Sequence, residues 1–165
     1  MRRAWRTGAN GKSMPEITWK PAATVAAICE RDGKFLLVRE QVDGRIVFNQ
    51  PAGHIEPGES VLQAVVRETL EETRYAFQPQ ALQGIYRFQP SADSAQTYLR
   101  FAIRGEVGER LDGELDEGII AAEWLDYASL LGCRAQHRSP MVLQCVDDYR
   151  SGRAFPLSVF SHEFA

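Results

Sequence analysis

Three glutamates, Glu68, Glu71 and Glu72, lie on one turn of a predicted helix in the stretch VRETLEET. At about 100° per residue, their side chains fall within an arc of roughly 100°. Like charges at this spacing repel, and a single neighbouring arginine, Arg67, cannot neutralise three carboxylates. Clustered hard oxygens are the ligands that Mg²⁺ or Mn²⁺ takes together with substrate phosphate oxygens. The cluster therefore indicates metal and phosphate chemistry, and the alternative is the solvated acidic face that charge runs usually form.

The helix itself has a clear start signal. Ser60, followed three residues later by Gln63, predicts a capping box and places the first turn there. The buried stripe is then formed by apolar residues at helical spacing, with the three glutamates nearly opposite to it. Its members are Leu62, Val65, Val66, Thr69 and Leu70. Upstream, Glu56 and Glu59 lie in a loop that contains glycine and proline and leads into the helix.

The rest of the chain alternates strands and helices. Asp32-Gly33 and Asp43-Gly44 predict two tight turns, the first of them within a β-hairpin. A late helix begins with Ser139 as its cap and Pro140 at its first position, and it ends at Gly152. Strands are predicted at 24–30, 35–40, 85–88, 98–107 and 121–127. A mixed sheet flanked by helices, an α/β/α sandwich, is the expected fold class.

Length and charge exclude several classes of protein. The 165 residues suit one domain, expected over 16–165, after a tail at 1–15. The first 13 residues are basic, lack acids and precede Met14, which favours a disordered tail or an alternative start over a short organellar transit peptide. A net charge of −3 argues against a nucleic-acid polymer or a membrane as partner. Three cysteines without metal-binding spacing are expected to be core residues in a reducing cytoplasm.

The spacing of the acidic residues resembles the signature of the Nudix hydrolases. Gly53 is followed after five residues by Glu59, after seven more by Arg67-Glu68, and after two more by Glu71-Glu72. The resemblance covers about Thr24 to Tyr127. It implies a Nudix-type α/β/α sandwich with a mixed β-sheet and metal-dependent hydrolysis of a diphosphate linked to another group.

A narrower resemblance to the NudJ-type phosphatases rests on FNQPAGHIEPGES, YLRFAIRG, the acidic run before Trp124 and RSPMVLQCVDDYRSGRAFPL. It implies hydrolysis of nucleoside di- and triphosphates and of thiamine or hydroxymethylpyrimidine pyrophosphate, by water attack on the phosphate chain. A housecleaning pyrophosphatase for oxidised nucleotides and an ADP-ribose-type nucleotide-sugar hydrolase are the alternatives. A non-catalytic nucleotide-binding module is disfavoured because all three glutamates are present.

The Nudix resemblance also implies roles for individual residues. Glu68 and Glu72 match the main metal ligands, and Glu71 matches a third ligand that often binds through water. The backbone carbonyl of Ala52, next to the signature glycine Gly53, matches a further ligand. The implied cofactor is Mg²⁺, with Mn²⁺ as the alternative.

Supporting roles follow from the same match. Arg67 would orient the carboxylates as part of the catalytic set, and Glu59 would brace Arg67. A fourth carboxylate, ligand or base, is expected from the loop ELDEGII, where Asp116 and Glu117 are both candidates.

Two positions depart from the signature. Thr69 stands where the family has an apolar residue, and its methyl group can still pack. Arg74 stands where the family has the glycine that ends the helix in a left-handed conformation, which costs a non-glycine residue about 1 kcal/mol.

Other residues are weaker candidates for substrate binding. Phe48 and Phe88 could stack on a ring, and His54 could approach a phosphate, although core packing and ordinary hydrogen bonding are the commoner roles of such residues. Strand arginines such as Arg100 are usually solvated. The expected partner is a small phosphoanhydride, bound by a monomer or homodimer.

Overall fold

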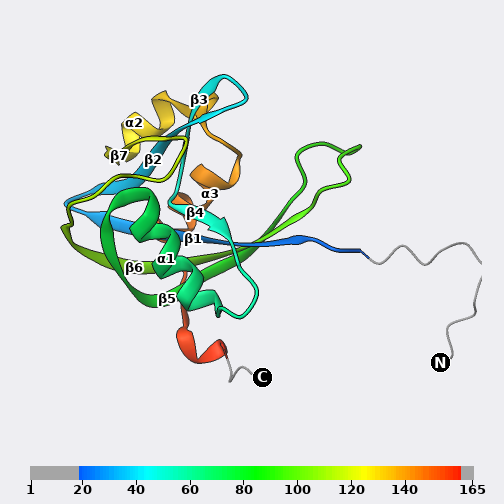
Figure 1. Cartoon of the computed structure of the whole chain (residues 1–165), viewed down its shortest axis with the longest axis horizontal. Helices are drawn as coiled ribbons and strands as arrows, with labels where there is room; N and C mark the ends of the chain where they lie inside the picture. The colour runs from blue at the N-terminus through cyan, green and yellow to red at the C-terminus, as the bar shows by residue number, and fades with distance from the viewer. Residues whose placement is uncertain (1–18, 161–165) are drawn as a thin grey trace, which may run out of the picture.

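The computed structural model describes residues 19–160, so the tail expected at 1–15 lies outside the described residues. Figure 1 shows a twisted sheet with helices on both faces. The strands are β1 (Ala22–Arg31), β2 (Lys34–Val42), β3 (Arg45–Asn49), β4 (Ala52–His54), β5 (Tyr75–Phe88), β6 (Tyr98–Arg110), β7 (Ile119–Asp126) and β8 (Phe155–Pro156). The helices are α1 (Val61–Thr73), α2 (Tyr127–Gly132) and α3 (Met141–Arg150), with 3₁₀ turns η1 (Arg134–Gln136) and η2 (Leu157–Val159).

The strand order β3-β2-β1-β6-β5-β8 makes a mixed sheet, because β1 and β6 run parallel while their other neighbours are antiparallel. β7 pairs with β2, and the short strand β4 pairs with β1. β1 pairs with β2 only at Glu30 and Arg31, whereas residues 24–26 of β1 pair with β4. β1 and β2 therefore diverge, and β4 lies on the edge of β1 that β2 has left.

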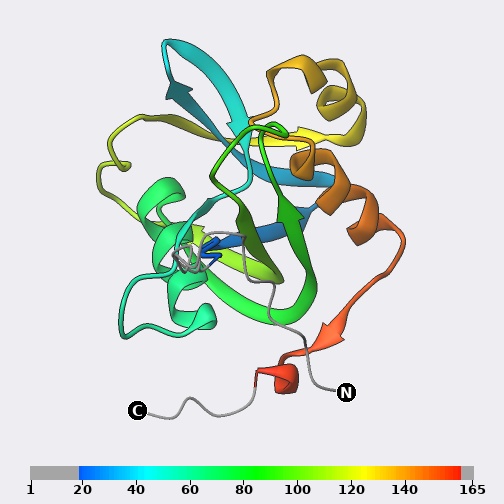
Figure 2. The ribbon, with the colours of Figure 1, turned by 90° about the vertical axis from the view of Figure 1, so that its right-hand side faces the viewer.

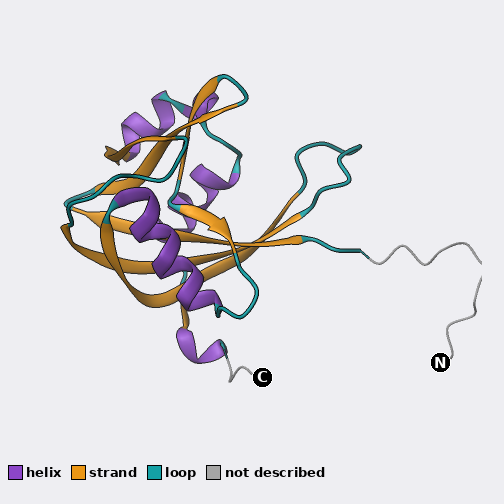
Figure 3. Ribbon diagram, in the orientation of Figure 1, coloured by secondary structure: helices purple, strands orange, loops and turns teal. Residues whose placement is uncertain are grey.

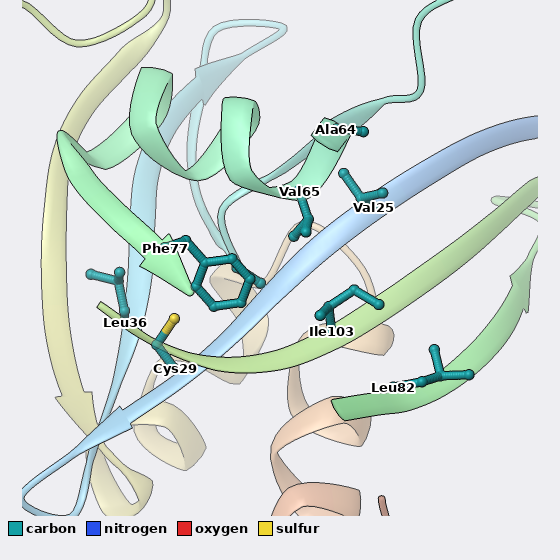
Figure 4. Packing of buried hydrophobic residues seen from close by; sticks show 9 residues of the cluster. Val25, Cys29, Leu36, Ala64, Val65, Phe77, Leu82 and Ile103 are labelled. Carbon is teal, nitrogen blue, oxygen red and sulfur yellow. The ribbon is translucent and has the colours of Figure 1, made fainter. Parts of the chain in front are cut away.

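Two hydrophobic clusters, one on each face of the sheet, hold the layers together. Alternation along β1 directs Val25, Ala27 and Cys29 to the cluster under α1, and Ile28 to the cluster under α3. Figure 4 shows the first cluster, with Val65 of α1 directed towards the sheet. The secondary-structure colouring in Figure 3 makes the three layers plain. The expected α/β/α sandwich with a mixed sheet is confirmed.

Both Asp-Gly turns are present as predicted. Asp32 and Gly33 have φ of 52° and 79°, and Asp43 and Gly44 have φ of 50° and 74°. Two successive residues with positive φ are the mark of the two-residue turn that matches the twist of a hairpin.

Other boundaries differ from the prediction. Pro140, not Ser139, is the N-cap of α3, and Ser139 makes no side-chain capping bond there. The first ten residues of β5, Tyr75–Gly84, and the short helix α2 were not predicted. Register shifts around Pro79 interrupt the alternation of side chains in β5. Helix α2 was missed because its six residues are too few to show helical periodicity.

Candidate metal and phosphate site

Helix α1 presents the acidic cluster, and its N-terminus is capped as predicted. The Ser60 side chain accepts a hydrogen bond from the Gln63 backbone, and the Gln63 side chain accepts one from the Ser60 backbone. At the other end Arg74 is left-handed, with φ of 63°, and its N–H still donates to the Leu70 carbonyl. The helix thus ends where the family's glycine would end it, although the residue is arginine.

The predicted buried face of α1 is confirmed only in part. The buried positions are Ala64, Val65, Glu68, Thr69, Glu72 and Thr73, whereas Leu62, Val66 and Leu70 are half-buried, although Leu62 and Val66 still pack against the core. Two of the glutamates therefore face inward instead of lying opposite the stripe. The reason is that β4 lies beside this part of α1 and covers Glu68 and Glu72.

Glu68 fits against β4 because residue 53 has no side chain. A Cβ atom on Gly53 would lie only 2.0–2.2 Å from the carboxylate atoms of Glu68. The carboxylate therefore occupies the space next to the strand backbone that only glycine leaves open. Burial raises the pKa of Glu68, and its hydrogen bond with Arg67 partly offsets that effect.

Glu72 lies beside the same strand, next to Ala52, the residue before Gly53. Its Oε2 accepts a hydrogen bond of 2.8 Å from the Ala52 N–H. The Pro51 carbonyl and the Ile55 N–H form hydrogen bonds with β1. In an antiparallel ladder such bonded residues alternate with unbonded ones, so the N–H and the carbonyl of Ala52 point away from β1, on the side where Glu72 lies. Burial raises the pKa of Glu72 to about 8, and the Ala52 bond only partly offsets this. A buried carboxylate in this position is stabilised by any added positive charge.

Arg67 joins the remaining acidic residues into one network. Its Nη1 donates to Glu68 Oε1 and to Glu71 Oε2, both at 2.9 Å. Its Nε and Nη2 form a two-point contact with Glu59 at 3.0 and 2.6 Å, and Nη2 also donates to the His54 carbonyl. The contact lowers the pKa of Glu59 and raises that of Arg67. The network ties α1 to the loop before it and to β4.

The loop before β7 brings a fourth carboxylate towards α1. The Asp116 N–H donates to the Glu71 carbonyl at 3.1 Å, and the Asp116 charge is near enough to help raise the pKa of both Glu68 and Glu72. Glu117 is also exposed. Of the two candidates, Asp116 is the one whose charge acts on the buried glutamates.

The donor set suits a hard divalent cation. Two inward-facing carboxylates and a backbone carbonyl offer only oxygen, which Mg²⁺ and Mn²⁺ prefer. Within residues 19–160, however, no three His, Cys, Asp or Glu side chains meet in an arrangement that would hold a metal ion. The Arg67 bonds hold Glu68 and Glu71 to one guanidinium, while Glu72 is bonded separately to Ala52.

A large cavity of about 1350 Å³ opens beside this cluster. Ala52, Gly53 and His54 of β4 form the wall nearest to α1. Residues of the β2–β3 ribbon and of the β5–β6 ribbon line this cavity, and Figure 2 shows both ribbons from the right-hand side of Figure 1. The volume exceeds what a drug-sized ligand requires.

The three residues predicted to contact substrate are only partly brought together. His54 and Phe88 line the cavity, and Phe88 lies against Tyr98 with ring centroids 6.5 Å apart. Phe48 is not among the residues that line the cavity, although its neighbours Val47 and Asn49 are. The Phe48 carbonyl instead accepts a hydrogen bond from Arg138.

The polar side chains of this cavity were not among the predicted site residues. Arg100, expected to be solvated, is only 7% exposed, and Glu40, Asn49 and Arg138 line the same space. A signal was present, because Arg100 alternates with Phe101 and therefore shares the face of the buried Ala102.

Comparison with known proteins places this chain in a family. Residues 18–145 match the model of the NUDIX domain. The chain is 34% identical over 142 residues to Phosphatase NudJ of Escherichia coli strain K12, covering 86% of this chain and 91% of the relative. A solved NUDIX hydrolase from Nitrosomonas europaea superposes with a TM-score of 0.84 at 46% identity, covering 87% of this chain and 98% of that one. The NUDIX domain of Shewanella oneidensis NrtR, solved with ADP ribose, shares the fold at 18% identity and a TM-score of 0.66, covering 85% of this chain and 93% of that one.

The chain belongs to the Nudix hydrolases, enzymes that hydrolyse phosphoanhydrides. Among its relatives it is similar to the phosphatases named NudJ over most of its length. In the described residues, no helix combines the length and the apolar character needed to cross a membrane.

Proposed function

We propose that the protein hydrolyses small organic di- and triphosphates that bear one flat ring, in a reaction that depends on Mg²⁺ or Mn²⁺. The expected substrates are nucleoside di- and triphosphates and thiamine or hydroxymethylpyrimidine pyrophosphate. The similarity to Phosphatase NudJ supports the phosphatase chemistry. The observation on which the proposal mainly depends is the burial of Glu68 and Glu72 against β4, beside a cavity large enough for such a molecule.

Three oxygen donors beside β4 would hold the metal. They are the carboxylate of Glu68, which lies against Gly53, the carboxylate of Glu72, which accepts a hydrogen bond from the Ala52 N–H, and the Ala52 carbonyl. Glu71 and Asp116 are more exposed and are joined by a backbone hydrogen bond, and they would bind the metal through water. A bound divalent cation would neutralise phosphate charge and lower the pKa of a coordinated water.

The remaining residues position this set and receive a proton. Arg67 and Glu59 fix the orientation of Glu68 and Glu71, which limits their motion during phosphoryl transfer. A carboxylate of the cluster would accept the proton of the attacking water. The cavity beside β4 would hold the organic group, so the phosphate chain would extend from the cavity towards Glu72.

A release assay tests the proposal. Phosphate and pyrophosphate release would be measured with Mg²⁺ or Mn²⁺ and with EDTA, across nucleotides, thiamine-pathway pyrophosphates, oxidised nucleotides, ADP-ribose and dinucleoside polyphosphates. We expect broad activity on ring-bearing di- and triphosphates and none in EDTA. Efficient turnover of ADP-ribose alone, or of a dinucleoside polyphosphate alone, would contradict the substrate class and leave the family assignment intact.

Glu72→Gln tests the metal site within the same assay. The variant keeps the side-chain shape, and its amide oxygen can still accept the Ala52 hydrogen bond. We expect turnover to fall by about two orders of magnitude or more, as when a strong transition-state interaction is removed. Glu106→Gln, a change at an exposed position of β6, is the control. Near-normal turnover by the Glu72→Gln protein would refute the site.

The cellular location and the oligomeric state are also proposals. The three cysteines are free thiols in the structure, which suits a reducing compartment such as the cytoplasm. Gel filtration with light scattering would distinguish the two expected states, a monomer and a homodimer.

A further inference from the structure

One arginine in the cavity wall has no counter-ion among the described residues. Arg100 lines the cavity and is 7% exposed, and no Asp or Glu oxygen of residues 19–160 lies within ion-pair distance of it. Its Nη1 donates a long hydrogen bond of 3.3 Å to Asn49 Oδ1. Its Nη2 makes no hydrogen bond within residues 19–160 and, unlike the closed Nε, keeps contact with solvent. Nη2 is therefore the donor that Arg100 can offer to a ligand, and a buried cation without a partner favours an anion.

The hydrogen bond to Asn49 directs the guanidinium towards the proposed metal site. Asn49 is the last residue of β3 and precedes Ala52, the first residue of β4, by three positions. Burial lowers the pKa of Arg100, whereas the charge of Glu72 is among those that raise it. The guanidinium is therefore near enough to Glu72 to interact with its charge, although the two groups are not in contact.

The pairing of the strands gives the position of Arg100 relative to β4. Arg100 of β6 is the register partner of Thr24 in β1, and Thr24 is the partner of His54 in β4. The three side chains share one face of the sheet, and all of them line the cavity. Arg100 and His54 are about 10 Å apart across two strand spacings, and Ala52 lies about 7 Å further along β4. A phosphate chain that starts at the Ala52 carbonyl and follows this wall therefore passes within reach of the Arg100 side chain.

The other charges that act on Arg100 have partners of their own. Glu40 Oε2 accepts a hydrogen bond of 2.9 Å from Arg138, so these two charges offset each other. Glu72 would be neutralised by the divalent cation of the proposed function. Arg100 is then the charge that still needs a partner, and a guanidinium matches the oxygens of a phosphate in shape and charge.

We propose that Arg100 is a substrate-binding residue that donates a hydrogen bond from Nη2 to a phosphate oxygen beside the metal site. The proposal rests on the proposed function, because it assigns one phosphoryl group of the substrate to the space between Arg100 and Glu72. Tyr98 and Phe88, a register pair with ring centroids 6.5 Å apart, lie further along the same wall, on the side of Arg100 away from Ala52. The organic group would therefore lie beyond Arg100, near these two rings.

The binding of a diphosphate that cannot be hydrolysed tests this without any catalytic step. Methylenediphosphonate has a carbon atom in place of the bridging oxygen. Titration calorimetry would measure its affinity for the protein saturated with Mn²⁺ and, separately, the affinity for Mn²⁺ alone. We expect Arg100→Met to bind the diphosphonate at least tenfold more weakly than the unaltered protein does. The affinity for Mn²⁺ alone should not fall, because the loss of a nearby positive charge does not disfavour a cation.

The control and the variants are matched to the structure. Arg104→Met changes an arginine on the same strand whose guanidinium packs over the Tyr149 ring, and it should leave both affinities unchanged. Arg100→Met removes a buried charge that has no charged partner in contact, a change that is often neutral or stabilising. If its melting curve nevertheless shows that it does not fold, Arg100→Gln keeps a donor for Asn49, removes the charge and should show the same loss.

Three results would overturn the proposal. The unaltered protein does not bind the diphosphonate; the folded Arg100 variant loses less than tenfold in affinity for it; or the variant loses affinity for Mn²⁺ alone to the same degree, which would make Arg100 a support of the metal site. The proposed function fails separately, when the diphosphonate binds through Arg100 but the unaltered protein hydrolyses none of the screened phosphates with metal.

Discussion

Gly53→Ala should damage activity while leaving the fold intact. Residue 53 has no positive φ, so the backbone tolerates alanine. The added methyl group, however, would lie 2.0 Å from Glu68 Oε1, and real Cβ contacts are essentially never shorter than 3.0 Å. The carboxylate of Glu68 must therefore move by at least about 1 Å.

The size of the effect follows from which atoms can move. The clash involves the far end of a side chain, so the Glu68 carboxylate can rotate away without moving β4 or α1. We expect the midpoint of thermal unfolding to change by only a few degrees, equivalent to about 1 kcal/mol. A misplacement of about 1 Å in a reacting group costs about 10²-fold in rate, or roughly 2.7 kcal/mol of barrier.

The assay is phosphate release with saturating Mg²⁺, together with a melting curve for each protein. Gly108→Ala is the matched control, because a Cβ there meets nothing within 4 Å and φ is not positive. Gly53→Ala activity within threefold of normal, in a folded protein, would mean that the position of Glu68 does not matter for catalysis. A large loss of stability would mean that β4 yields instead of the side chain, which would refute the packing argument.

Two further predictions concern the C-terminal end of α1 and the three cysteine thiols. Arg74→Gly should change the unfolding free energy by less than about 1 kcal/mol or stabilise the protein slightly. The reason is that relief of the left-handed strain outweighs the loss of an exposed hydrogen bond to the Asp112 carbonyl. Clear destabilisation in urea unfolding would show that the arginine contacts matter more than the strain. Cys133, half-exposed, should react first with a thiol reagent at pH 8. Burial raises the pKa of Cys29 to about 12 and of Cys145 to about 11, so both have little reactive thiolate and should be labelled only on unfolding. Equal labelling rates for the three would contradict this.

Local signals in the sequence predicted local structure well. The Ser60 and Gln63 pair defined the start of α1, and the Asp-Gly pairs defined two turns, because each feature depends on a few adjacent residues. The conformation of Arg74 was left open by its departure from the signature glycine, and the structure shows it to be left-handed. The expectation that all three cysteines lie in the core was wrong for Cys133, which sits on an exposed turn after α2.

Features that depend on distant segments could not be predicted in the same way. A helical wheel ranks faces by hydrophobicity, so it could not show that β4 would cover Glu68 and Glu72. The contact between Arg100 and Asn49 joins residues 51 positions apart in the chain. Both depend on where strands lie after folding, and only the strand alternation at Arg100 hinted at its burial.

The repulsion among the three glutamates is relieved unequally. Arg67 shares one nitrogen between Glu68 and Glu71, and a third acidic partner, Glu59, fixes its orientation. Glu72 receives only the neutral N–H of Ala52, and burial raises its pKa to about 8. An added divalent charge would therefore stabilise Glu72 more than its two neighbours, whose charge Arg67 already offsets. For this reason Glu72→Gln, rather than a change at Glu71, separates a metal site from an acidic surface that arginine alone would stabilise.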